Sequence, residues 1–165
     1  MTLRVGLLLS TLACTSPRGD APRDHSSIEP AAAAVPAFSV ELRRITKHPT
    51  CLGNERVKVD DQGAVVSATN QAECAAGTVW STPYPAAPRY RLTAAERDQL
   101  GRLLQTSGVM DLPPLTTDPA KVTTDGAREE LDILVGSRHA VVAVEGTEVA
   151  AFAKVRQALL DLSKR

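Results

Sequence analysis

The segment LDILVGSRHAVVAV, Leu131–Val144, decides the fold of this chain. Apolar residues recur at every second position on either side of Gly136-Ser137, and a period of two predicts two β-strands. A two-residue loop that begins with glycine is typical of a tight hairpin. With this loop Leu131 faces Val142, and the residues on that face are all apolar. The segment therefore predicts an antiparallel hairpin with one buried face.

The other face of this hairpin carries the polar residues that could support chemistry. His139 is expected opposite Leu134 and diagonal to Asp132, and Ser137 is two residues away. Serine, histidine and aspartate together can form a nucleophile and its base. Ser137 belongs to the turn, however, and no oxyanion-hole motif accompanies it. We expect a solvated Asp132–His139 contact and assign no catalytic residue; an envelope hydrolase that uses this pair is the alternative.

A helix is predicted to follow this hairpin and another to precede it. Thr147 is expected to cap the last helix, and Thr93-Ala-Ala-Glu96 is a capping box that predicts a helix over 94–106, ended by Ser107-Gly108. The buried face of the last helix is predicted to consist of five apolar residues: Val149, Phe152, Val155, Leu159 and Leu162.

The first half of the domain repeats this order of elements. A strand is expected over 38–42, and Arg43-Arg44-Ile45 breaks its alternation, which suggests a bulge or the strand end. A hairpin follows, with strands at 55–60 and 64–69 and Gln62-Gly63 as its loop, so that Val59 faces Val66. The predicted class is α+β: one antiparallel sheet of about four to five strands with two helices on one face, built as two hairpin–helix units over residues 38–165.

The N-terminus has the pattern of an export signal. Arg4 precedes an apolar stretch that ends at Ala13, too short to span a bilayer, so residues 1–13 are predicted to be a signal peptide. Ala13 followed by Cys14 resembles the lipobox of bacterial lipoproteins. This resemblance implies that Cys14 is lipidated, and Thr15 after it implies the outer membrane rather than inner-membrane retention. The alternative is an ordinary signal peptide with an incidental cysteine.

Residues 14–37 are rich in proline and alanine and have no apolar periodicity. We expect this segment to be a tether between the lipid anchor and the domain, in an exported protein held in the cell envelope.

Two further cysteines flank the first predicted hairpin. Behind an export signal, Cys51 and Cys74 are predicted to form a disulfide bond. Catalytic or metal-binding cysteines are the alternative, although no CxxC motif and no nearby histidine cluster support it.

Two long loops stand out by composition. The loop Gly77–Arg91 holds Trp80, Tyr84 and Tyr90 among three prolines, and it is the candidate binding loop because aromatic residues on a stiff loop lose little entropy on binding. In the alternative interpretation the loop is a lid whose aromatic residues pack on the sheet. The second loop is Val109–Ala127; if both loops lay at one edge of the sheet, they would form a protein-binding rim.

Composition excludes several classes of protein. The chain of 165 residues has 19 basic and 19 acidic side chains, and this neutral balance argues against a nucleic-acid binder. Scattered histidines and the absence of a glycine-rich phosphate loop predict no metal and no cofactor.

The segment Leu92–Leu112, the proline-rich loop after it, Asp125-Gly126 and the final hairpin are together similar in organisation to emfourin-like inhibitors of thermolysin-type metallopeptidases. The resemblance implies a protein-binding domain that inhibits a peptidase, and it assigns no inhibitory residue. The expected function is therefore a non-enzymatic envelope lipoprotein that binds another envelope protein. A hydrolase, or a structural spacer without a tight partner, is the alternative.

Overall fold

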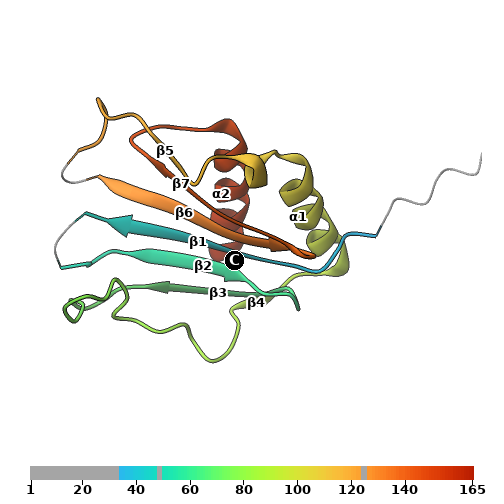
Figure 1. Cartoon of the computed structure of the whole chain (residues 1–165). Coiled ribbons are helices and arrows are strands. Elements are labelled where there is room, and N and C mark those ends of the chain that lie inside the picture. Colours follow the sequence, from blue (N-terminus) through green and yellow to red (C-terminus); the bar gives the residue numbers. More distant parts are fainter. Residues whose placement is uncertain (1–33, 48–49, 124–125) are drawn as a thin grey trace, which may run out of the picture. The chain divides into compact units, whose positions relative to one another are not determined.

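The computed structural model describes residues 34–47, 50–123 and 126–165, and these residues belong to one compact unit (Figure 1). The predicted signal peptide 1–13, Cys14 and most of the tether lie outside the described residues. The elements are β1 (Phe38–Thr46), β2 (Glu55–Val59), β3 (Ala64–Thr69), β4 (Tyr90–Arg91), α1 (Ala94–Thr106), the short 3-10 helix η1 (Val109–Asp111), β5 (Leu115–Thr117), β6 (Ala127–Val135), β7 (Arg138–Glu145) and α2 (Ala150–Ser163). Neither α1 nor α2 has the length and apolar character that a bilayer span needs.

The strands form one sheet in the order β4-β3-β2-β1-β6-β7-β5. All neighbours are antiparallel except β5 and β7, which are parallel. The α+β class is confirmed, but the prediction of four to five antiparallel strands was wrong. The additional strands β4 and β5 have only two and three residues, too few to show a period of two in the sequence.

Both helices cover the same face of the sheet (Figure 1). Alternate residues of β1, β2, β6 and β7 point into this layer and form one apolar core with the helices. The largest fully buried side chains include Leu131 and Ile133 of β6, Leu104 of α1 and Phe152 of α2. Because these side chains fill the helix-covered face, the polar residues between them must lie on the opposite face.

The two hairpins differ in how well their sequences predict their register. Leu131 pairs with Val142 as predicted. In the first hairpin Val59 pairs with Val65, one residue away from the predicted Val66. Its loop has three residues rather than two, because the backbone N–H of Asp60 still donates to the carbonyl oxygen of Ala64. Gly63, the last loop residue, takes the left-handed conformation at φ 74°. Glycine at that position is typical of three-residue hairpin loops.

Two predicted boundaries were wrong and one was confirmed. Strand β1 does not end at Arg43 but stays paired with β6 as far as Thr46. The N-cap of α2 is Val149, not Thr147, and no side chain caps this helix. Helix α1 spans the predicted residues, and Thr93 and Glu96 form the predicted capping box.

Candidate functional site

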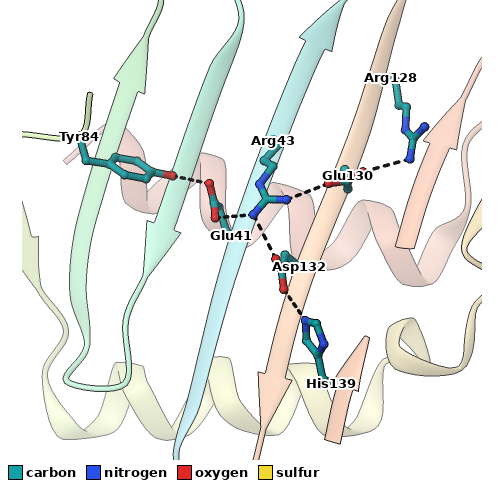
Figure 2. A network of polar contacts seen from close by, with 7 residues as sticks. All are labelled: Glu41, Arg43, Tyr84, Arg128, Glu130, Asp132 and His139. Carbon is teal, nitrogen blue, oxygen red and sulfur yellow. Dashed lines mark hydrogen bonds and ion pairs between the residues drawn. The ribbon is translucent and has the colours of Figure 1, made fainter. Parts of the chain in front are cut away.

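The face of the sheet opposite the helices, here called the open face, carries a connected set of charged side chains (Figure 2). At its centre Arg43 of β1 contacts three carboxylates. Its Nη1 donates to Glu130 Oε1 at 2.9 Å, and its Nη2 donates to Glu41 Oε2 at 2.9 Å and to Asp132 Oδ2 at 3.0 Å. Arg128 donates to the other oxygen of Glu130 at 3.0 Å. We call these residues, with Tyr84 and His139, the polar network.

The register of the strands explains why these residues meet. Arg43 lies directly opposite Glu130 in the β1–β6 pair, and Glu41 lies directly opposite Asp132. Directly opposed side chains are the closest neighbours on a sheet face. The hydrogen bond that Arg43 donates to Glu41 is the largest influence on Arg43 and raises the pKa of its guanidinium. The arginine therefore stays charged and holds the carboxylates in fixed positions.

His139 lies at one end of the polar network and makes the contact that the sequence predicts. Its Nε2 is 2.8 Å from Asp132 Oδ1, and 58% of its side chain is exposed. The second oxygen of Asp132 is bound by Arg43. Ser137 is exposed in the hairpin loop, and no hydrogen bond joins it to His139 among the described residues. Ser137 is therefore not placed as the nucleophile that a serine hydrolase needs.

At the other end of the polar network lies the strap, residues 71–89, which joins β3 to β4. The rings of Trp80 and Tyr84 lie 4.7 Å and 4.0 Å from the guanidinium carbon of Arg56 on β2, both within cation–π range. Arg56 also donates to the carbonyl oxygen of Thr82 at 2.9 Å. The hydroxyl of Tyr84 donates to Glu41 Oε1 at 2.9 Å. Trp80 and Tyr84 are therefore packed onto the sheet rather than presented to solvent.

Two buried asparagines and a disulfide hold the strap in place. Cys51 and Cys74 are bonded as predicted. Asn54 donates to the carbonyl of Val79, and Asn70 donates to the same carbonyl. Asn70 also accepts the backbone N–H groups of residues 81 and 82. The sequence gives no signal for this role, because an asparagine between strands is equally typical of a turn.

Tyr90 is separated from the other two aromatic residues of the candidate binding loop. Tyr90 belongs to β4, where it pairs with Val65 of β3, and its ring packs against the core. Its hydroxyl donates a hydrogen bond to the carboxylate of Glu96 in α1. The two long loops also lie apart, since β4 and β5 form opposite edges of the sheet. A common rim made of both loops, which the sequence left open, is therefore not formed.

A set of exposed apolar residues lies beside the polar network. Leu115, Leu134 and Val141 are 44%, 41% and 38% exposed, although each is large and apolar. Val141 pairs with Asp132, Leu134 pairs with His139, and Leu115 of β5 joins the same face next to β7. Directly paired residues point to the same side of a sheet, so these three form a diagonal row across β6, β7 and β5 on the open face. We call this row the apolar stripe.

The pKa shifts at the strap end of the polar network fix which of its groups is charged. Burial works to raise the pKa of Glu41, but hydrogen bonds from Arg43 and Tyr84 outweigh it, and the net pKa lies below the ordinary value. Burial, and then the charge of Glu41, raise the pKa of the Tyr84 hydroxyl. At neutral pH this pair is thus a carboxylate and a neutral phenol, the combination that makes a strong hydrogen bond.

Within the described residues, no group of three or more histidine, cysteine or acidic side chains is placed to hold a metal ion. The sequence matches no model of a known protein family, and no curated protein matches it. The function must therefore be argued from the open face itself.

Proposed function

We propose that this chain is a non-enzymatic, lipid-anchored protein of the cell envelope whose domain binds another envelope protein through the apolar stripe. The observation that carries the proposal is the exposure of Leu115, Leu134 and Val141 side by side on one face. Neighbouring large apolar residues that stay exposed typically mark protein-binding surfaces, whereas single ones do not. A spacer without a partner has no need of such a row.

The polar network can fix the orientation of a docked partner, which an apolar contact alone does not do. Asp132 and His139 stand next to the stripe, and both are already held by hydrogen bonds. A partner that docks on the stripe would meet polar groups that lose little conformational freedom on binding. The proposed partner therefore presents apolar side chains flanked by groups that hydrogen-bond to a carboxylate and an imidazole.

The location in the envelope is proposed from the signal-like residues 1–13 and the Cys14 that follows them. The Cys51–Cys74 disulfide supports export, because such bonds persist in oxidising compartments.

The proposal is tested with matched apolar substitutions. Leu134→Thr and Val141→Thr together remove most of the stripe, and threonine is a β-branched residue that suits a strand. Leu52→Thr and Val79→Thr are the control pair, since Leu52 and Val79 are each 42% exposed elsewhere on the domain. We expect a partner crosslinked to the wild-type protein in its native cells to be retained by the control and lost from the stripe variant. Equal capture by both variants would reject the stripe as the binding surface.

A more specific form of the proposal is inhibition of a metallopeptidase, and it is supported by the emfourin-like order of elements. It is tested by adding the purified domain to a thermolysin-type peptidase and measuring the initial rate of peptide cleavage. Inhibition that disappears in the stripe variant supports this form. An unchanged cleavage rate with peptidases of the same envelope counts against it and leaves protein binding to be tested by crosslinking.

The alternative function is that of an envelope hydrolase, and the observation in its favour is the 2.8 Å contact between His139 and Asp132. A histidine oriented by a carboxylate can act as a general base towards water. This alternative predicts that His139→Ala abolishes hydrolysis of ester or amide substrates by the purified domain while the fold is kept. Activity that survives the substitution would remove it.

A further inference from the structure

We infer that Tyr84 of the strap is a positioning residue for the binding surface: through Glu41 and Arg43 it fixes Asp132 and His139 at the edge of the apolar stripe. The consequence for binding rests on the proposed function, but the positioning itself does not. Figure 2 shows these contacts as a continuous path from Tyr84 through Glu41, Arg43 and Asp132 to His139, with a side branch at Arg43 to Glu130 and Arg128.

In the first step, the two oxygens of one carboxylate accept hydrogen bonds from two different donors. Glu41 uses Oε1 to accept from the hydroxyl of Tyr84 and Oε2 to accept from Arg43. Only 14% of its side chain is exposed, so water cannot easily replace either donor. Without the hydroxyl of Tyr84, Oε1 of Glu41 loses its donor, and the carboxylate can rotate about its remaining contact with Arg43.

The second step is a shared nitrogen. The Nη2 atom of Arg43 that donates to Glu41 also donates to Asp132, and its Nη1 donates to Glu130. A guanidinium is planar and rigid, so its donors move together. A change in the Glu41 contact is therefore passed to Asp132 as a change in the distance or angle of its hydrogen bond.

The third step leads to the surface. Asp132 holds His139 with the oxygen that Arg43 does not use. Asp132 lies opposite Val141 and His139 lies opposite Leu134, so both polar groups border the apolar stripe. The strap thus governs polar groups on strands with which it is not paired.

Tyr84 is suited to this role because its own position is fixed independently of Glu41. Its ring lies on Arg56, Pro83 and Pro85 restrict the backbone on either side, and the buried Asn70 holds the preceding residues. The strap is therefore a rigid support, and the hydroxyl of Tyr84 is a donor in a fixed position.

The experiment compares single-atom changes in the full domain by nuclear magnetic resonance. Tyr84→Phe removes the hydroxyl and keeps the ring, and Tyr90→Phe is the matched control because the Tyr90 hydroxyl bonds to Glu96 near the helices. We expect Tyr84→Phe to shift the side-chain resonances of Arg43, Asp132 and His139 and Tyr90→Phe to leave them in place. Unmoved Asp132 and His139 resonances in Tyr84→Phe would overturn the inference.

A second variant separates the hydroxyl from general loosening of the strap. Trp80→Leu removes one ring from Arg56 but keeps the bond between Tyr84 and Glu41. If Trp80→Leu shifts Asp132 and His139 as much as Tyr84→Phe does, packing of the strap rather than its hydroxyl sets their position, and the inference is wrong. Once a crosslinked partner is known, Tyr84→Phe is expected to weaken its binding several-fold, whereas failure to find any partner would count against the proposed function alone.

Discussion

Arg43 joins three carboxylates of the polar network. Its planar guanidinium serves three carboxylates at once, which the point charge of a lysine could not do with the same geometry. In the sequence Arg43 only marks a break in apolar alternation, because two of its partners lie nearly ninety residues further along the chain. Asp132 and His139 were predicted to share a face, but the contacts of Arg43 depend on the pairing of β1 with β6, which the sequence does not determine.

Removing Arg43 leaves three carboxylates close together, of which Glu130 keeps its ion pair with Arg128 while Glu41 and Asp132 lose their arginine partner. We expect Arg43→Met to lower the free energy of unfolding by about 2 kcal/mol, since breaking a partly buried ion pair costs more than losing a surface one. Urea unfolding monitored by circular dichroism measures this loss. Arg44→Met is the control, because the Arg44 side chain is 49% exposed and forms a surface ion pair with Glu55 at 3.3 Å. A loss of equal size in both variants would contradict the central place of Arg43.

The lowered pKa of Glu96 predicts how the free energy of unfolding depends on pH. Hydrogen bonds, first from Tyr90 and then from the backbone and side chain of Thr93, lower its pKa from 4.5 to about 2. A carboxyl group whose pKa is lower in the folded state stabilises the fold above its unfolded pKa, and this contribution is lost as the pH falls from about 4.5 to about 2. We expect Glu96→Gln to flatten the slope of the unfolding free energy over this range. The exposed Asp61 gives a control, Asp61→Asn, and equal slopes in Glu96→Gln and wild type would refute the assignment.

At the scale of elements, local sequence patterns predicted the features that depend only on residues close together in the chain. The capping box of Thr93 and Glu96 gave the start of α1, and the alternation in β6 and β7 gave their register. Strand β5 depends on a parallel pairing with β7 that no local sequence pattern predicts. The buried Asn54 and Asn70 are likewise recognisable only once the strap folds back over them.

The capping box should contribute measurably to the stability of α1. Thr93→Ala removes the side-chain oxygen that accepts the N–H of Glu96, and a lost N-cap typically costs about 1 kcal/mol. Chemical denaturation of Thr93→Ala is compared with that of Thr106→Ala, where the hydroxyl only bonds to the carbonyl of Arg102 one turn earlier. An unchanged midpoint in Thr93→Ala would show that tertiary packing alone sets where α1 begins.

The strap should depend on its disulfide. Cys51 and Cys74 are separated by 23 residues, and on the chain-entropy model closing such a loop stabilises the fold by about 3 kcal/mol. We expect the double variant Cys51→Ser, Cys74→Ser to lose an amount of this order in urea unfolding. We also expect faster quenching of Trp80 fluorescence by iodide, since the strap then loses its covalent link and keeps non-covalent contacts, among them those with Asn70, Arg56 and Glu41. Quenching identical to that of the wild type would mean that the disulfide does not hold the strap on the sheet.

The domain as a whole has two unlike faces. The helices lie on one face (Figure 1), and on the open face the rings of Trp80 and Tyr84 from the strap lie on Arg56 of β2. What stays uncovered is the part of the open face formed by β6, β7 and β5, where the apolar stripe and the end of the polar network meet. This division places the proposed binding surface away from the loop that the sequence favoured for that role.

The most direct test of the proposed binding surface uses a photoreactive amino acid placed at one position at a time in the full-length protein within its native cells. Position 141 reports on the apolar stripe, and position 79 reports on an equally apolar and similarly exposed site on the strap. We predict that illumination joins one specific protein to position 141 and none to position 79. An adduct at position 79 alone, or the same set of adducts at both positions, would contradict the account.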